Sequence, residues 1–532
     1  MIVRSEAPCK TVPASPFDAG ACVPNSLEHW AADRPDDIAI VDGDTTLTFR
    51  AWNDAADRAA RGLLDLGAQP GDIIAIRSQI RHEWQIVHAA AAKLGCSVLP
   101  FNWRLTTVET RFVLEDSRAT FLVFDDDDPA VCLAASEGLP LKARISLGAG
   151  QAPDVVRFAN LIDTPAPTHL FSTGRPPLII YTSGTTGRPK GVAMIRAEVT
   201  PEMLEYVQSI EAVDPQRAGA VTLLTLPMHH GAGPNLCWNA LRAGNPIVMM
   251  RRFEPEAALA VIERWRVNHW TVVPTMLKRV ASLAPDVLAR YDISSIRSIR
   301  VGAAPVPSTV REWTIGHFGH VLHEGYGATE VGMIAHLRPE DMQRKPGSSG
   351  LPHRHVHIRI KDESGHALPA GQVGAVWVKS PVVIDRYLNG PMLGRDVLDS
   401  DSYFAVGDAG WLDEDGFIYL SDRIKDMIIS GGVNIYPAEI EAAMITHPAV
   451  QDVAVIGIPD DEFGEAVKAF VELRPGMSLD ADTLQAFIQP LLASYKRPRT
   501  IEFVAELPRS TMGKVLKREL RNPFWKNQER SV

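Results

Sequence analysis

The sequence predicts an α/β fold, with a large N-terminal domain of layered helices and mostly parallel sheets and a small, mobile α+β C-terminal domain. Helical and strand patterns alternate along most of the chain, which is typical of helices packed on parallel sheets. Several apolar strand runs end in glycine-rich or polar loops, and the pattern changes near residue 422. The length of 532 residues favours two or more domains over one.

The N-terminal part shows this alternation most clearly. Amphipathic periodicity predicts helices over Leu27–Arg34, Ala51–Gly67 and Arg81–Leu94. Short apolar runs predict strands over Asp72–Arg77 and Cys96–Pro100. This order of elements predicts helices layered on the faces of a largely parallel sheet.

Four further apolar runs predict strands of the large domain. They lie at Leu178–Thr182, Val221–Pro227, Ile247–Met250 and Val272–Val273, and glycine-rich or polar loops follow such runs. In open α/β sheets, ligands bind outside the carboxyl ends of the strands. We therefore expect a ligand site at the loops that follow these segments.

The C-terminal domain is predicted to begin close to residue 422. Gly416–Leu420 has the pattern of a closing strand, and a compact α/β module follows it. The predicted elements of this module are the helix Ala438–Thr446, the strands Val450–Ile458 and Ala466–Leu473, and the helix Ala481–Leu492. We therefore expect two domains, 1–422 and 423–532, and the second has a common domain size of about 110 residues.

The composition excludes several classes of protein. A formal net charge of -10 gives no basic footprint for nucleic acid. The five cysteines contain no CxxC pair, so they predict neither a disulfide framework nor a zinc site and suit a reducing cytoplasm. No window reaches the roughly 18 apolar residues of a membrane-spanning helix. Peripheral membrane contact and a homodimer stay open.

The most informative segment is the loop 181–191, with the sequence YTSGTTGRPKG. Gly184 and Gly187 allow backbone N–H groups to approach an anion, and Lys190 adds a cation for phosphate charge. Further hydroxyl donors come from Ser183, Thr185 and Thr186. A Walker A loop requires Ser or Thr directly after its lysine, and Gly191 follows Lys190 here, so that alternative fails.

This loop and the motifs that follow it resemble the signature of the adenylate-forming (ANL) superfamily, which includes acyl-CoA synthetases and other AMP-binding enzymes. The further motifs are YGATE at 326–330, GD at 407–408, DRIKD at 422–426, SGGVNIYP at 430–437 and PRSTMGK at 508–514. The resemblance implies an AMP-forming acid–thiol ligase that uses ATP, Mg²⁺ and coenzyme A. A carboxylic acid would first become an acyl-adenylate, and the CoA thiolate would then displace AMP.

The resemblance also implies which residues hold the nucleotide. Tyr326 offers a flat face to adenine, Thr329 a hydroxyl to the α-phosphate, and Glu330 a carboxylate to Mg²⁺, a hard cation that prefers oxygen ligands. Asp408 and Arg423 match the two positions that bind ribose. The other cofactor-binding residues implied are Thr182, Ser183, Gly184, Thr186, Gly187, Lys190, Gly302, Ala303, Ala304, Glu324, Gly325 and Gly327.

Catalysis is assigned by the resemblance to Lys514, Thr185 and Glu330. Lys514 would bridge the attacking carboxylate and the α-phosphate and so stabilise the charge of the transition state. Lys425 matches the hinge about which the small domain rotates between the two steps. Gly431 and Gly432 would then line the channel of the CoA pantetheine.

His230, Ala303 and Gly325 match positions of the acyl pocket. A glycine at 325 leaves room for a medium- or long-chain fatty, aryl or steroid-like acid, whereas related acetate enzymes place a tryptophan nearby. A histidine that only satisfies its own loop is equally compatible with the sequence around His230. Two alternatives stay open: an acyl-AMP ligase that loads a separate carrier protein, and an inactive nucleotide-binding homologue.

Overall fold

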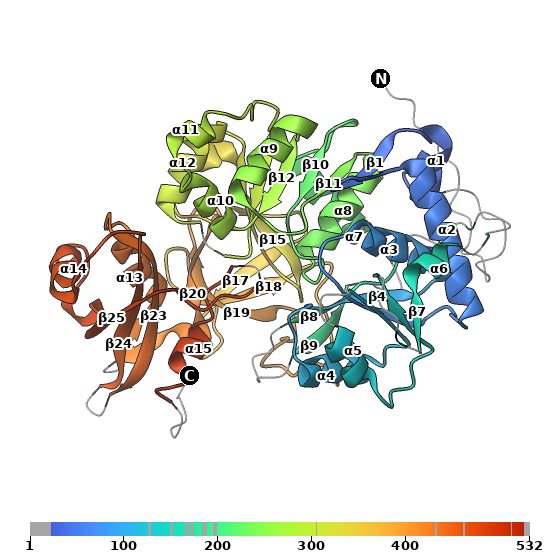
Figure 1. The fold of residues 1–532 in the computed structure, drawn as a ribbon. Helices are drawn as coiled ribbons and strands as arrows, with labels where there is room; N and C mark the ends of the chain where they lie inside the picture. The colour runs from blue at the N-terminus through green and yellow to red at the C-terminus, as the bar shows by residue number, and fades with distance from the viewer. Residues whose placement is uncertain are drawn as a thin grey trace.

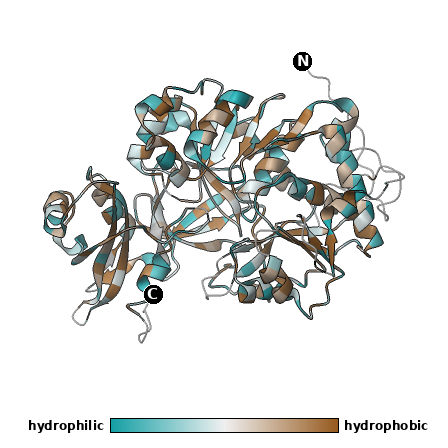
Figure 2. Ribbon diagram, viewed as in Figure 1, coloured by the Kyte–Doolittle hydropathy of each residue, from teal (hydrophilic) through white to brown (hydrophobic). Residues whose placement is uncertain are grey.

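The computed structural model describes residues 23–125, 129–148, 152, 154–163, 165, 170, 172, 175–182, 189–194, 199–304, 306–430, 433–460, 463–511 and 513–525. Two parallel-stranded layers and an antiparallel layer form the large part of the molecule, and the elements from β21 to α15 form a smaller part beside it (Figure 1). Hydrophobic residues concentrate on the strands, and hydrophilic residues lie on the outer faces of the helices (Figure 2).

The first layer is a parallel sheet in the order β4-β3-β5-β6-β7. Its strands are β3 (Ile73–Arg77), β4 (Ser97–Pro100), β5 (Phe121–Phe124), β6 (Ala143–Ser146) and β7 (Val155–Arg157). The helices connected to it are α2 (Phe49–Asp65), α3 (His82–Leu94), α4 (Thr107–Ser117), α5 (Pro129–Ser136) and α6 (Phe158–Ile162). The predicted helices and strands of this region are confirmed to within two residues at each end.

The second layer is a nine-stranded sheet in the order β16-β15-β14-β13-β12-β10-β11-β1-β2. Its strands are β1 (Ile38–Asp42), β2 (Thr45–Thr48), β10 (Thr222–Leu224), β11 (Ile247–Met249), β12 (His269–Val272), β13 (Ser298–Val301), β14 (Leu322–Ala328), β15 (Gly332–Leu337) and β16 (Leu351–Pro352). The central strands, in the order β14-β13-β12-β10-β11-β1, pair in parallel. The strands β2, β15 and β16 add antiparallel edges. The associated helices are α1 (Leu27–Asp33), α7 (Pro201–Val213), α8 (Ala232–Arg242), α9 (Pro255–Trp265), α10 (Pro274–Ala281), α11 (Pro285–Leu288) and α12 (Ser308–Phe318).

Antiparallel strands complete the large part of the molecule. The strands β8 (Ile179–Thr182) and β9 (Lys190–Ala193) form a two-stranded ladder on either side of the glycine-rich loop. A four-stranded sheet consists of β17 (His357–Lys361), β18 (Gly374–Lys379), β19 (Phe404–Leu412) and β20 (Ile418–Arg423). The predicted closing strand at Gly416–Leu420 corresponds to β20, which is an antiparallel edge strand of this sheet.

Among its described residues, the smaller part has a five-stranded sheet and three α-helices. The strands are β21 (Ile428–Ser430), β22 (Val433–Ile435), β23 (Val450–Asp460), β24 (Gly464–Leu473) and β25 (Thr500–Val504). The helices are α13 (Pro437–Met444), α14 (Ala481–Ile488) and α15 (Lys517–Arg521). Its buried apolar cluster runs from Ile428 to Leu492. The α/β fold class is confirmed, and the exact boundary at residue 422 stays a prediction.

In the described part of the chain, no helix has both the length and the apolar character needed to cross a bilayer.

Helix α3 is buried around most of its circumference, because its sequence is rich in alanine and large apolar residues. It ends at Gly95, whose φ of 66° closes the helix in the left-handed conformation. His88 lies on this helix with an exposed fraction of 7%, and its ring stacks on Trp84 with centroids 5.0 Å apart. Burial lowers the pKa of His88 to about 3, so the folded state keeps this ring neutral.

We expect this histidine to make the folded state less stable in acid. The unfolded chain binds one more proton than the folded chain between the unfolded pKa of about 6.5 and the folded pKa of about 3, so stability falls as the pH falls through this window. For His88 alone, the loss between pH 7 and pH 5 is about 2 kcal/mol. Urea unfolding of the wild type and of His88→Gln at both pH values checks this. An equal loss in both proteins would contradict the assignment.

Candidate active site

The glycine-rich loop is described only at its two ends. Thr182 closes β8, Lys190 opens β9, and the two residues pair directly across the ladder. The predicted residues Ser183, Gly184, Thr185, Thr186 and Gly187 lie outside the described residues, so their roles stay predictions. Because β8 and β9 are antiparallel neighbours, the two ends of the loop, at Thr182 and Lys190, lie side by side.

Glu330 lies beside the two ends of this loop, in the turn between β14 and β15. The Thr182 hydroxyl donates to Glu330 Oε1 over 3.3 Å, and the Tyr387 hydroxyl donates to the same oxygen over 3.4 Å. The ammonium of Lys190 lies 4.8 Å from the centroid of the Tyr387 ring. The fold therefore brings together three predicted residues, Thr182, Lys190 and Glu330, and adds Tyr387, which the sequence reasoning did not select.

The charges of this cluster fit a magnesium–phosphate group. Within the described residues, the carboxylate of Glu330 has only hydroxyl partners, and the ammonium of Lys190 has no carboxylate partner. Carboxylate oxygens are ligands that Mg²⁺ prefers, and a lysine ammonium binds phosphate as a point charge. Thr329 precedes Glu330 in the same turn and is half-buried. The donor set is therefore suited to Mg·ATP at this end of the loop.

The predicted ribose residues lie on adjacent strands. Asp408 on β19 pairs directly with Arg423 on β20. The Tyr326 hydroxyl donates to Asp408 Oδ2 over 2.6 Å, and both side chains are buried. The structure thus brings Tyr326 of one motif to Asp408 of another, 82 residues later in the chain.

The strand ends of β13 and β14 pack closely at their glycines. A Cβ atom on Gly302 would lie 3.1 Å from the carbonyl oxygen of Gly325, and a Cβ on Gly327 would lie 2.6 Å from that of Gly332. A Cβ on Gly325 would lie 2.9 Å from Met333 Cε. The space beside Gly325 is therefore shared with the methionine side chain, a feature that the expectation of an open pocket there did not include.

Ala303 and Glu324 show two further constraints. Ala303 has a φ of 68°, a left-handed conformation that non-glycine residues rarely adopt and that is frequent at functional sites. Ala304 follows it in the same bend. The carboxylate of Glu324 forms a bidentate ion pair with Arg311, with contacts of 2.5 and 3.0 Å. Burial raises the pKa of Glu324, and the ion pair with Arg311 opposes this rise. The carboxylate of Glu324 is therefore already engaged by Arg311.

His229 and His230 lie in the loop directly before α8. Burial lowers the pKa of His229 to about 3 and that of His230 to about 4, so both rings are neutral at neutral pH. The ring centroids lie 4.9 Å apart. His229 Nε2 lies 3.0 Å from the hydroxyl of Thr511, a residue of the C-terminal part.

This contact positions the segment that carries Lys514. Arg509 and Val515 form a β-bridge, and Gly513 lies in the turn between them with a φ of 71°. A Cβ atom on Gly513 would lie 2.1 Å from the Thr275 hydroxyl at the start of α10, so only glycine fits against this helix. The side chain of Lys514 is exposed. The turn therefore packs against the large part of the molecule beside His229.

Other contacts support the same arrangement of the two parts. Lys278 on α10 forms an ion pair with Asp452 over 3.5 Å and donates to the carbonyl oxygen of Gln451. Within the predicted C-terminal domain, Arg521 donates to the carbonyl oxygen of Lys425, the predicted hinge residue, over 2.8 Å. Gly431 and Gly432, which follow this hinge, lie outside the described residues.

The sequence alone could not select Thr275, Lys278, Tyr387 or Thr511. Their partners are far away in the chain, and neither periodicity nor local motif distinguishes them. Thr511 had the strongest signal, because it lies inside the predicted motif at 508–514.

Comparison with known proteins agrees with this arrangement. The family described as "AMP-binding enzyme" matches residues 27–388, and "AMP-binding enzyme C-terminal domain" matches residues 439–514. A fatty acid–[acyl-carrier-protein] ligase, ScoC, from Streptomyces coeruleorubidus is 33% identical over 94% of this chain and 96% of its own length. A feruloyl-CoA synthase from an Amycolatopsis species is 33% identical over 94% of this chain and 99% of its own length.

A solved structure extends the likeness to the fold. O-succinylbenzoate coenzyme A synthetase (MenE) from Bacillus subtilis, in complex with ATP and magnesium, superimposes with a TM-score of 0.78 and 29% identity. The match covers 94% of this chain and 99% of that structure. The chain therefore belongs to the AMP-binding enzyme family of the adenylate-forming superfamily, and it is an AMP-forming acid–thiol ligase.

Proposed function

We propose that the chain is an acyl-CoA synthetase that converts a carboxylic acid, ATP and CoA into acyl-CoA, AMP and pyrophosphate. The observation that carries this proposal is the packing of the turn with Lys514 against Thr275 and His229. This packing holds a cationic side chain near the face where the acyl pocket is expected, as attack on an α-phosphate requires.

In the first step, an oxygen of the carboxylate attacks the α-phosphorus of ATP, and pyrophosphate leaves. Lys190 offsets the negative charge of the phosphates, and Lys514 stabilises the charge that grows on the α-phosphate oxygens. Mg²⁺ held by Glu330 would neutralise phosphate charge during this step. Asp408 orients the ribose, and the hydrogen bond from Tyr326 fixes the carboxylate of Asp408.

In the second step, the CoA thiolate attacks the carbonyl carbon of the acyl-adenylate, and AMP leaves. The small domain would rotate about Lys425, which withdraws Lys514 and brings Gly431 and Gly432 to the substrate channel. The contacts of Lys278 and Thr511 with the opposite part belong to the arrangement that serves the first step.

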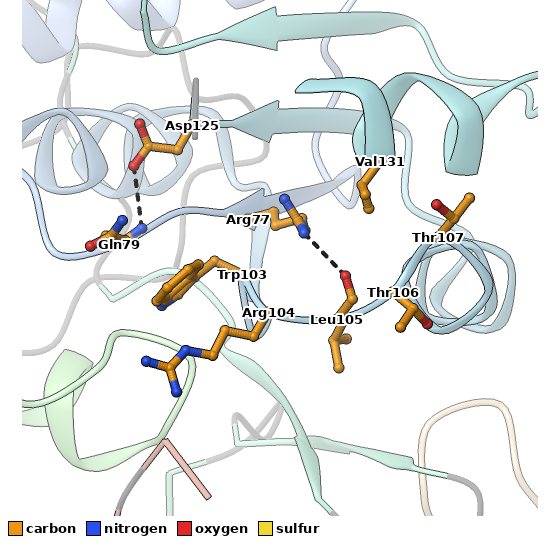
Figure 3. Close-up of a pocket in the computed structure, with 9 residues that line it drawn as sticks. All are labelled: Arg77, Gln79, Trp103, Arg104, Leu105, Thr106, Thr107, Asp125 and Val131. Atoms are coloured by element: carbon orange, nitrogen blue, oxygen red, sulfur yellow. Dashed lines mark hydrogen bonds between the residues drawn. The ribbon is translucent and has the colours of Figure 1, made fainter. Parts of the chain in front are cut away.

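A cavity of about 570 Å³ offers a site for the nucleotide end of CoA. It lies where β3, β4 and β5 end, and the order β4-β3-β5 places it at a switch point of the parallel sheet, where ligands of open α/β sheets bind. Arg77, Trp103 and Arg104 line this space, together with Thr106, Thr107 and Asp125 (Figure 3). Two guanidinium groups and an indole are suited to phosphates and a purine.

One residue of this cavity, Arg104, lies near His229. Arg104 lies close enough to His229 to contribute to the lowered pKa of that histidine, after the larger effect of burial. The guanidinium of Arg104 also lies 4.8 Å from the centroid of the Trp103 ring.

The acid proposed is a medium- or long-chain fatty, aryl or steroid-like carboxylate. Relatives at 32–33% identity include ligases named for ferulate, 2-succinylbenzoate, indoleacetate and long-chain fatty acids. A carrier protein is the second candidate acceptor, because the relative ScoC is named for an acyl-carrier-protein reaction. A cytoplasmic location and a homodimer also stay proposals.

The test is AMP release from ATP across a panel of these acids, with CoA, with an acyl carrier protein, or with neither. We expect one class of acid to give AMP and a CoA thioester in equal amounts. Accumulation of acyl-adenylate that only the carrier protein discharges would replace CoA with the carrier protein. Release of AMP with none of the acids would contradict the proposal itself.

A further inference from the structure

Helix α10 presents one face to the smaller part of the molecule. Thr275 and Lys278 are three positions apart on this helix, so their side chains lie on the same side of it. Thr275 packs against Gly513, where an added Cβ atom would lie only 2.1 Å from the Thr275 hydroxyl. Lys278 contacts strand β23. One helix face therefore touches both the turn that carries Lys514 and the sheet of the smaller part.

Lys278 makes two polar contacts with β23. Its ammonium donates to the carbonyl oxygen of Gln451 and lies 3.5 Å from Asp452 Oδ2. The side chains of Lys278 and Asp452 each have an exposed fraction of 17%, so most of the ion pair is removed from water. Burial lowers the pKa of Lys278, and the carboxylate of Asp452 opposes this change. The contact with the smaller part therefore favours the charged form of the lysine.

Asp452 belongs to a charged group within the smaller part. Arg509 Nη2 donates to Asp452 Oδ2 over 2.5 Å and lies 3.4 Å from Glu472 Oε2. The same oxygen of Glu472 accepts from the Leu507 N–H over 3.2 Å. Two carboxylates and one guanidinium give this group one net negative charge. Lys278, from the large part, supplies the cation that balances it.

The same group reaches the turn that carries Lys514. Arg509 Nη1 donates to the carbonyl oxygen of Gly513 over 3.2 Å. Arg509 is also the residue that shares Asp452 with Lys278. A continuous series of polar contacts therefore runs from Lys278 to the residue that precedes Lys514.

Rotation of the smaller part between the two half-reactions would separate Lys278 from its partners, because α10 belongs to the large part and β23 to the smaller part. An ion pair that forms in only one of two arrangements stabilises that arrangement relative to the other. Removal of one partner also leaves the remaining charge poorly compensated. The ion pair therefore favours the arrangement in which the turn with Lys514 packs on α10.

We propose that Lys278 is a positioning residue for the turn that carries Lys514. Its ion pair with Asp452, which Arg509 connects to the turn, sets the balance between the two half-reactions. This inference rests on the proposed function, because it assumes the same two half-reactions.

The test measures each half-reaction separately in the wild type, Lys278→Met, Lys278→Arg and the control Arg279→Met. The acid is the one that gives the fastest AMP release from the wild type in the panel above. Arg279 is the neighbouring residue on α10, and its ion pair with Glu254 is exposed and lies within the large part.

Lys278→Met keeps a long, unbranched side chain and removes its charge. It should lower the rate of pyrophosphate exchange into ATP roughly tenfold, because one partner of a largely buried ion pair is lost. The rate of thioester formation from presynthesised acyl-adenylate and CoA should fall by less than about twofold, because this step does not need the ion pair. Lys278→Arg should restore part of the exchange rate, and Arg279→Met should leave both rates within about twofold of the wild type.

Three results would overturn the inference alone. An equal loss of both half-reactions in Lys278→Met would show a general structural role. Unchanged pyrophosphate exchange in this variant would show that the arrangement does not depend on the ion pair. Exchange in Lys278→Arg as slow as in Lys278→Met would show that the charge has no effect. Absence of pyrophosphate exchange in the wild type with every acid of the panel would instead refute the proposed function.

Discussion

Lys514→Ala is expected to lower the rate of acyl-adenylate formation by about 10²- to 10³-fold, the range seen when one preorganised donor to a developing oxyanion is removed. The turn that carries this lysine packs on Thr275 and contacts His229, so its backbone position does not depend on the lysine side chain. The measurement is exchange of labelled pyrophosphate into ATP in the presence of the acid.

The second half-reaction separates catalysis from folding. Lys514→Ala supplied with presynthesised acyl-adenylate and CoA should form thioester at a rate close to that of the wild type. Lys496→Ala, which removes a surface ion pair with Glu439, should leave both half-reactions nearly unchanged. An equal fall of both half-reactions in Lys514→Ala would contradict the assigned role.

Glu330→Gln is expected to lower kcat on the order of 10²-fold and to raise the Mg²⁺ concentration needed for half-maximal rate. The substitution keeps an oxygen that can accept from Thr182 and Tyr387, so the cluster should retain its shape while it loses its charge. The measurement is the rate of AMP release as a function of Mg²⁺ at saturating ATP.

The matched control for this variant is Glu340→Gln, an exposed glutamate after β15. It changes the net charge by the same amount and should leave the Mg²⁺ dependence unchanged. A Glu330→Gln enzyme with reduced rate but the wild-type Mg²⁺ requirement would show that Glu330 acts only through its hydrogen bonds.

Local sequence patterns predicted most helices and strands, because the periodicity of apolar residues along a short segment shows which positions a helix or strand buries. The exceptions have local causes. Helix α14 ends at Ile488 rather than at the predicted Leu492, since Pro490 lacks an N–H and restricts the residue before it. Strand β12 begins at His269, earlier than the predicted Val272, because Trp270 is part of the buried core.

The site residues were predicted only from motifs, and their roles stay predictions. Glu330, Asp408 and Lys514 come from such motifs, and the structure adds the contacts of their surroundings. The hydrogen bond between Tyr326 and Asp408 and the contact between His229 and Thr511 join residues 82 and 282 positions apart. Such pairings depend on the assembled sheets and domains, so no local pattern in the sequence could reveal them.

The most direct test of the central claim follows an oxygen atom of the substrate. A carboxylic acid labelled in both oxygens with the heavy isotope is turned over with ATP and CoA, and the products are weighed by mass spectrometry. Attack of the carboxylate on the α-phosphorus predicts one labelled oxygen in AMP and none in pyrophosphate. Label in inorganic phosphate, with ADP as the nucleotide product, would show an acyl phosphate instead and would contradict the account.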